Sequence, residues 1–197
     1  MRSHTGSPAP STGRVLMLLA SALGLIALPF LVQALGQPAL VPLATRVLIY
    51  AIAAASLNLA LGFGGMVSFG HAAYFGTGAY TVATLQVHLD VNPWFGLLLG
   101  GLAATAVAAF IGFSTFRYGL RGSYFALVTL AFAEVLRILA NTVWFTGAGV
   151  GLLIPLERST ENFQFPGKAG FFWVVWAMTL AAFLAVWLIG NSRYGAQ

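Results

Sequence analysis

Long apolar runs constrain this chain more than any other feature. Six stretches of about 20 residues carry almost no charge, and they occupy residues 15–35, 43–61, 66–85, 93–113, 122–144 and 170–190. An α-helix needs about 20 consecutive apolar residues to cross the hydrocarbon core of a bilayer. Only 7% of the residues are charged, whereas a soluble domain carries about 25%. The sequence therefore predicts an all-α integral membrane protein with about six transmembrane helices.

Lys and Arg residues predict which side of the membrane each connection faces. If the N-terminus is inside, the inner segments carry only basic charges, at Arg2, Arg14, Arg117, Arg121 and Arg193. The outer segments then carry mixed charges, at Asp90, Glu157, Arg158, Glu161 and Lys168. Basic residues prefer the cytoplasmic side, and Trp94, Trp144 and Trp173 then fall at outer interfaces, where indole rings prefer to lie. We therefore expect an N-in, C-in orientation.

The N-terminal region divides into a polar tail and an apolar run. Residues 1–14 contain Ser, Thr, Pro, Gly and two Arg, a composition that favours disorder. The run 15–35 could be the apolar part of a signal peptide, but it is longer than the usual 7–15 residues. We expect a disordered cytoplasmic tail at 1–14 and a transmembrane domain that begins at residue 15.

Charge, cysteine content and missing motifs exclude several classes of function. The net charge is +5, but the basic residues are scattered and form no patch for nucleic acid. The chain has no cysteine for a disulfide or a thiolate metal site. It also lacks a G-x-x-x-x-G-K-[ST] loop for ATP and any nucleophile–base pair. We expect neither an enzyme nor a metal or cofactor site, and we expect the lipid bilayer, not nucleic acid, as a partner.

The segment 122–144 has one polar face on a helical wheel. Ser123, Glu134, Arg137 and Asn141 fall within one arc. Beside them lie the small residues Gly122, Ala126, Thr129, Ala133 and Ala140. The opposite arc predicts a lipid-facing surface of Phe125, Val128, Phe132, Val135, Leu136, Leu139 and Val143. Glu134 and Arg137 are three residues apart and can pair. Such a pair either serves a function or orients the helix in a bundle.

The segment 66–85 has no continuous Leu, Ile and Val surface. Its glycines lower helical stability, so a break or kink is expected. A membrane helix without a lipid face is either surrounded by protein or lines a path. His71, near its inner end, is either a hydrogen-bonded structural residue or part of a path or gate. We therefore expect this third helix to be glycine-rich and central.

Small residues recur at every fourth position of the segment 93–113. They are Gly96, Gly100, Ala104, Ala108 and Gly112. A ridge of small side chains lets a second helix approach closely in a membrane. We expect this ridge to be a helix-packing surface.

Two stretches of the chain resemble a known family. They are LNLALGFGGMVSFGHAAYFGTGAY, from Leu57 to Tyr80, and LRGSYFALVTLAFAEVLRILANTVWFTGAGVGL, from Leu120 to Leu152. Both are similar to the permease subunits of ABC importers for branched-chain amino acids, of the LivM type. The resemblance covers about residues 40–195 and matches the N-terminal portion of such a permease.

The resemblance implies a function and a set of partners. The chain would carry branched-chain or other hydrophobic amino acids across the inner membrane of a bacterium. Its partners would be a sister permease, two cytoplasmic ATPases that bind ATP in its place, and a periplasmic substrate-binding protein. That binding protein could dock on the outer loop 146–169. The path candidates are Asn58, Ser68, His71, Ser123, Glu134, Arg137 and Asn141.

The sequence departs from the family pattern in two places. The family usually has T-G-G-x-x-G-L where this chain has Thr146-Gly147-Ala148-Gly149-Val150-Gly151-Leu152, so we expect an altered turn at Ala148. In the family, a run similar to Ser192-Arg193-Tyr194-Gly195 leads into the ATPase-docking loop and further helices. Residues 15–197 would then be an incomplete permease domain, either an N-terminal fragment or a truncated product.

Three other functions stay open at this point. Relatives in the same family carry urea or short amides. A proton-coupled carrier could use His71 and Glu134 as a relay. A structural membrane subunit would have no path at all.

Overall fold

The chain folds into helices. The computed structural model describes residues 24–37, 39–63, 65–120, 122–154 and 162–190. These residues form helices and no strand, which confirms the all-α class. Four stretches are long and apolar enough to cross a membrane: Leu40–Gly62, Pro93–Arg117, Ser123–Thr142 and Lys168–Gly190. They contain helices α2 (Leu40–Asn58), α4 (Pro93–Arg117), α5 (Ser123–Thr142) and α6 (Lys168–Gly190).

Two expected spans are not among these four. The first is described only from residue 24, where a shorter apolar helix covers Gly24–Ala34. The other is α3, His71–Leu89, which has 19 residues and is rich in threonine, tyrosine and glycine. The count of six spans and the N-in, C-in orientation therefore stay predictions.

Some predicted features lie outside the described residues. They are the tail 1–14, the first part of the span 15–35, the run after residue 190, and the charges at Arg2, Arg14, Arg121, Glu157, Arg158, Glu161 and Arg193.

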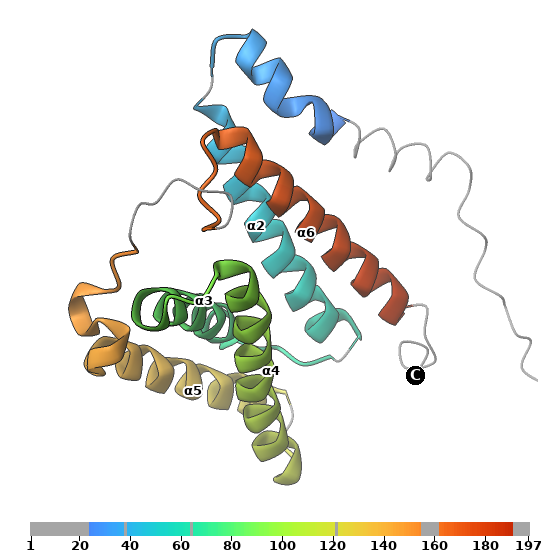
Figure 1. Ribbon diagram of the computed structural model, residues 1–197. Helices are drawn as coiled ribbons and strands as arrows, with labels where there is room; N and C mark the ends of the chain where they lie inside the picture. The colour runs from blue at the N-terminus through green and yellow to red at the C-terminus, as the bar shows by residue number, and fades with distance from the viewer. Residues whose placement is uncertain (1–23, 38, 64, 121, 155–161, 191–197) are drawn as a thin grey trace, which may run out of the picture.

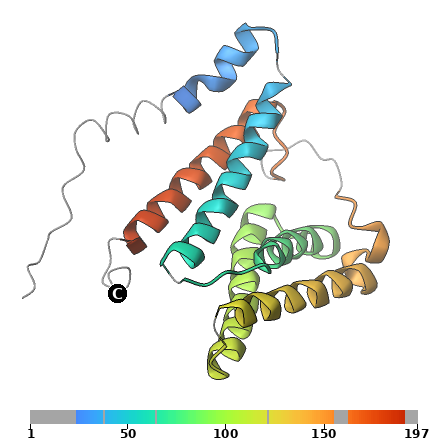
Figure 2. The same ribbon diagram turned by 180° about the vertical axis from the view of Figure 1, so that it is seen from behind.

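Helices α2 and α6 form one packed group. They lie side by side and run in the same direction, with the Gly24–Ala34 helix near the ends at which both begin (Figures 1 and 2). The core of this group consists of Val32, Val41, Leu48, Phe172 and Val175. These apolar side chains join helices that are more than a hundred residues apart in the sequence.

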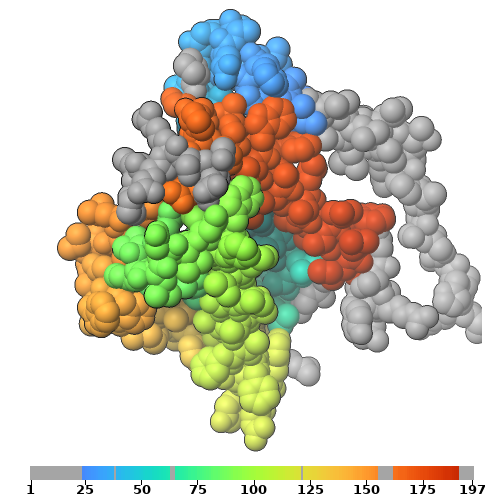
Figure 3. All heavy atoms as spheres, in the orientation of Figure 1, coloured from blue at the N-terminus to red at the C-terminus, as the bar shows by residue number. Residues whose placement is uncertain are grey.

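Helices α3, α4 and α5 form the second group. Helix α3 packs on both α4 and α5, while α4 runs across them (Figures 1 and 2). Ile111 of α4 is buried, and the rings of Phe116 and Phe125 stack with centroids 6.0 Å apart. The far end of α4 projects below the rest of the molecule in the space-filling view (Figure 3). Helix α3 thus makes the most extensive contacts within this group.

Glycines bring α3 and α4 into close contact. A Cβ placed on Gly100 would lie 2.9 Å from the carbonyl oxygen of Gly78 and 3.0 Å from Cγ2 of Val82. A Cβ on Gly96 would lie 3.3 Å from Cγ1 of Val82. This confirms the predicted packing ridge at Gly96 and Gly100. At Gly112 the nearest atoms belong to Phe116 of the same helix, so the interhelical contact does not extend that far.

The turn between α3 and α4 is short and well specified by the sequence. Asp90 ends α3 in the left-handed region, with φ 53°. The Asn92 side chain accepts a hydrogen bond of 2.9 Å from the backbone N–H of Trp94, and Pro93 takes the first helical position. Asn before Pro is a typical helix start. This turn sets α4 back against α3.

The boundary of the predicted segment 66–85 is wrong at its start. A π-helical turn at Leu59–Phe63 extends α2, Gly65 follows with φ +60°, and α3 begins only at His71. The N–H groups of Gly65 and Met66 donate to the carbonyls of Leu61 and Ala60. Glycine is the residue that best accepts this left-handed helix end. The expected break therefore lies before α3. It falls between residue 66, where the helix was predicted to begin, and His71, where it begins.

Gly70, the residue before α3, lies against the backbone of α5. A Cβ on Gly70 would overlap the backbone carbonyl of Thr129 in α5. The chain crosses α5 at this point with backbone against backbone. Gly70 is therefore required by tertiary contact.

Candidate functional site

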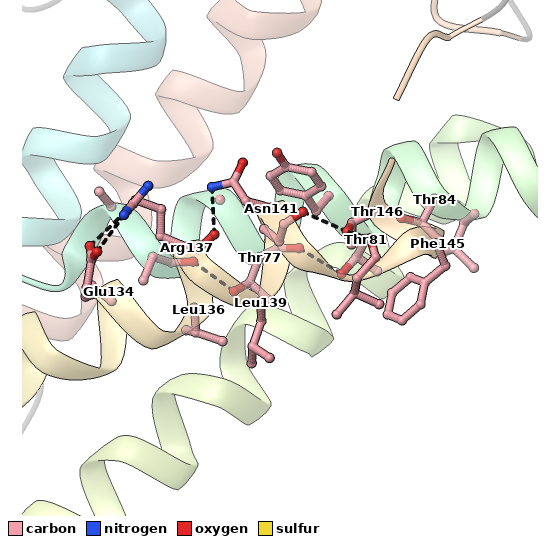
Figure 4. A pocket seen from close by; sticks show the side chains of 18 of the residues that line it. Thr77, Thr81, Thr84, Glu134, Leu136, Arg137, Leu139, Asn141, Phe145 and Thr146 are labelled. Carbon is pink, nitrogen blue, oxygen red and sulfur yellow. Dashed lines mark hydrogen bonds and ion pairs between the residues drawn. The ribbon is translucent and has the colours of Figure 1, made fainter. Parts of the chain in front are cut away.

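A groove of about 860 Å³ lies between α3 and α5. Most of its lining is apolar, with a small number of polar side chains (Figure 4). Pockets of about 300–1,000 Å³ with this kind of lining are typical small-molecule sites. The groove is the candidate functional site.

Helix α3 contributes a row of threonines to the groove. Thr77, Thr81 and Thr84 recur at helical spacing, with Tyr80 beside them. The Thr77 and Thr81 hydroxyls each donate a 2.8 Å hydrogen bond to the carbonyl four residues earlier. A hydroxyl oxygen that donates in this way can still accept a hydrogen bond. The row therefore offers acceptors to a ligand.

Helix α5 contributes an ion pair. Arg137 Nη2 lies 2.6 Å from Glu134 Oε1, and Arg137 Nε lies 2.9 Å from Glu134 Oε2. This two-point contact confirms the predicted pairing. The Arg137 side chain is 63% exposed and the Glu134 side chain is 53% exposed. Charged groups inside a membrane face a bundle interior or a wet cavity, so this groove must be wet or covered by another protein.

Two further polar groups hold the α5 side of the groove. The Asn141 side-chain amide donates a 2.9 Å hydrogen bond to the Arg137 carbonyl. The Thr146 hydroxyl lies 2.8 Å from the carbonyl of Ala140 and 2.7 Å from that of Val143. The threonine fixes the turn that follows α5. These bonds satisfy backbone carbonyls near the end of α5.

His88 connects the two walls at one end of the groove. Its Nε2 lies 2.9 Å from the backbone carbonyl of Phe145, which lines the groove after α5. The His88 ring also meets the Trp144 ring edge-on, with centroids 6.1 Å apart. Figure 4 shows Phe145 and Thr84 at this end and Glu134 at the other. The two walls of the groove are therefore linked at the end away from the ion pair.

The turn beyond Phe145 contains the altered glycine motif. Gly147 and Gly151 have φ values of 80° and 81°, and a Cβ on Gly147 would overlap the carbonyl of Gly151. Ala148 itself has φ 47°. The left-handed conformation costs a residue other than glycine about 1–2 kcal/mol. Ala148 therefore adopts this strained conformation. The expectation that the turn differs from the turn in the family stays a prediction.

The structure brings together three of the seven predicted path residues. Glu134, Arg137 and Asn141 line the groove, whereas Asn58, Ser68, His71 and Ser123 do not. Asn58 ends α2 and Ser123 begins α5, and both are exposed. The Ser68 hydroxyl is buried without a hydrogen-bond partner among the described residues.

His71 has a structural contact. Its Nε2 lies 2.6 Å from the Ser56 hydroxyl of α2. Its ring also meets Tyr74 edge-on, with centroids 5.9 Å apart. Glu134 is bonded to Arg137 instead. The proposed proton relay between His71 and Glu134 thus has no direct bond in this structure.

The predicted lipid face of α5 is partly wrong. Phe125 is 7% exposed and packs on α4. Leu136, Leu139 and Val143 line the groove. A helical wheel averages over the whole helix, but the neighbours of α5 change along its length. Its first half packs on α4 and α3, and its second half borders the groove.

Some groove residues were not predicted from the sequence, and they include Tyr80, Thr81 and Phe145. His88, which bonds to the Phe145 carbonyl from outside the lining, was also not predicted. The spacing of Thr77, Thr81 and Thr84 was a usable signal. The contact of His88 with Phe145 spans 57 positions and has no sequence signal.

Comparison with known proteins identifies the family. The family model described as the permease component of branched-chain amino acid transport systems matches residues 39–197. The chain belongs to this permease family. The all-helical fold and the apolar spans agree with a multi-pass membrane protein of this kind.

Two curated relatives are similar to this chain. Both are high-affinity branched-chain amino acid transport system permease proteins named LivM. The protein of Salmonella typhimurium strain LT2 is 37% identical over 138 residues, and that of Escherichia coli strain K12 is 36% identical over 138 residues. These residues make up 70% of this chain and 31% of each relative. No solved structure matches the chain.

Proposed function

We propose that this chain is part of an ABC importer permease for branched-chain or other hydrophobic amino acids in the inner membrane of a bacterium. The groove between α3 and α5 is the observation that carries the proposal, because it joins an apolar lining to a few polar groups. The groove would form part of the substrate path, through alternating access. The two LivM relatives, both branched-chain amino acid transport system permease proteins, support this substrate class.

The proposal includes the partners that such an importer requires. A sister permease would complete the path, two cytoplasmic ATPases would bind ATP and drive it, and a periplasmic protein would deliver the substrate. The chain itself would have no catalytic role and bind no cofactor. The family membership supports these assignments.

Uptake of labelled leucine tests the energy source. In vesicles that contain the assembled transporter, uptake should continue with an uncoupler present while ATP is supplied, and it should stop when ATP is replaced by a non-hydrolysable analogue. Loss of uptake with the uncoupler, at constant ATP, would instead support a proton-coupled carrier.

The same assay separates the other two alternatives. A permease for urea or short amides would take up those compounds and not leucine. A structural subunit would show unchanged uptake after Arg137→Gln, because its polar face would border no path.

A further inference from the structure

We infer that the Glu134–Arg137 pair recognises the charged head group of the transported amino acid. Arg137 would bind the α-carboxylate and Glu134 the α-ammonium. The inference rests on the proposed function and adds to it the residues that distinguish a zwitterion from a neutral amide.

The first observation is the unused bonding capacity of the pair. The contact engages Nε and Nη2 of Arg137, and the two N–H groups of Nη1 bond to none of the residues that the structure describes. Each Glu134 oxygen accepts one hydrogen bond from Arg137 and has a further lone pair. Both side chains are more than half exposed. The pair can therefore add a ligand without a change of helix position.

The second observation is charge complementarity. An α-amino acid presents one negative and one positive group on the same carbon. The pair presents the opposite charges side by side on one face of α5 and is the only ion pair between described residues. A planar guanidinium binds a carboxylate through two parallel hydrogen bonds. Arg137 could bind a carboxylate in this way through Nη1 and the second N–H of Nη2, so the Glu134 contact stays and the site remains neutral.

The third observation is the lining next to the pair. Leu130, Ala133 and Leu136 lie on the same part of α5, and Ala73 and Gly76 lie opposite on α3. These side chains carry no polar atom, so they suit an aliphatic side chain. The threonines lie farther along the groove (Figure 4). Head group and side chain would thus meet different parts of one groove.

Four leucine-like ligands test this division. Binding to the purified membrane complex that contains this chain would be measured in nanodiscs by calorimetry. The ligands are leucine, 4-methylpentanoate (carboxylate only), 3-methylbutylamine (ammonium only) and 4-methylpentanamide (neutral). The wild-type complex should bind leucine about tenfold or more tightly than the neutral amide, since hydrogen bonds to charged groups are worth at least that factor.

Single variants should separate the two charges. Arg137→Gln should weaken the binding of leucine and of 4-methylpentanoate by about tenfold or more, because the carboxylate loses its partner. The binding of 3-methylbutylamine, which has no carboxylate, should stay unchanged. Glu134→Gln should give the reverse pattern. Arg117→Gln is the matched control, since it removes a positive charge at the end of α4, outside the groove.

A neutral double variant keeps the test valid if a single variant unfolds. Glu134→Gln with Arg137→Gln leaves no unpaired charge. It should bind 4-methylpentanamide as the wild type does and lose the preference for leucine. A retained preference in the double variant, an equal loss of both half-ligands in each single variant, or no preference in the wild type would overturn the inference. The proposed function fails separately, if the wild-type complex shows no ATP-driven leucine uptake.

Discussion

At the scale of single residues, His71 shows how a polar group in a membrane protein can be structural. Its hydrogen bond to Ser56 joins α3 to α2, and thus joins the two helix groups. The bond is short, at 2.6 Å, and it lies where the chain leaves α2 and enters α3. The sequence left a structural role and a path role open; the observed contact favours the structural one.

Replacing either partner tests this contact. His71→Ala and Ser56→Ala should each lower the free energy of unfolding by about 1 kcal/mol, the typical net value of one hydrogen bond. The double variant should cost little more than the larger single effect, because both changes remove the same bond. Denaturant unfolding of the purified protein in detergent gives these values.

Ser114→Ala is the control for this cycle. Among the described residues, the Ser114 hydroxyl bonds to the Phe110 carbonyl of its own helix, at 2.8 Å. Its effect should add to that of His71→Ala. Additive effects of His71→Ala and Ser56→Ala would show that the two residues do not stabilise each other.

At the scale of helices, adjacent glycines of α4 have different roles. Gly100 faces Gly78 and Val82 of α3, whereas a Cβ on Gly101 would meet nothing within 4 Å. The two positions share a helix and a residue type, so a comparison between them isolates the packing contact.

Alanine at each position gives opposite expectations. Gly100→Ala should lower the free energy of unfolding by about 1–3 kcal/mol, since overpacking forces the helices apart. Gly101→Ala should leave stability unchanged or raise it by up to about 1 kcal/mol, because alanine is the better helix former. Thermal unfolding in detergent measures both. Equal effects at the two positions would argue against the close α3–α4 contact.

At the scale of the whole molecule, the two helix groups contact each other at few points. Besides the His71–Ser56 bond, aromatic rings connect α4 to the segment before α6. The Trp94 and Phe163 rings are 4.4 Å apart, and Phe163 also meets Phe171 at 6.1 Å. The groove lies wholly within the α3–α5 group. A rearrangement between the groups could therefore leave the groove intact.

Membrane orientation is a prediction for the whole molecule, and the absence of cysteine makes it simple to test. Asp90→Cys and Arg117→Cys place one thiol at either end of α4. In intact cells a membrane-impermeant maleimide should label position 90 and not position 117, since basic residues prefer the inner side. Permeabilised cells should show both labels. The reverse pattern would contradict the N-in orientation.

The sequence by itself determined the membrane class, the approximate spans of α2, α4, α5 and α6, and the pairing of Glu134 with Arg137. Each follows from local rules: apolar run length, and side-chain spacing along one helix. The resemblance of the residues 57–80 and 120–152 gave the family, which comparison confirmed.

Only the tertiary structure decided where the groove lies and which residues enter it. The sequence could not separate Glu134, which faces the groove, from His71, which bonds to α2, because both are polar residues in apolar segments. It could not show that Phe125 is buried while Leu136 borders the groove. Those outcomes depend on which helix packs beside each position, and that follows from contacts between residues distant in the chain.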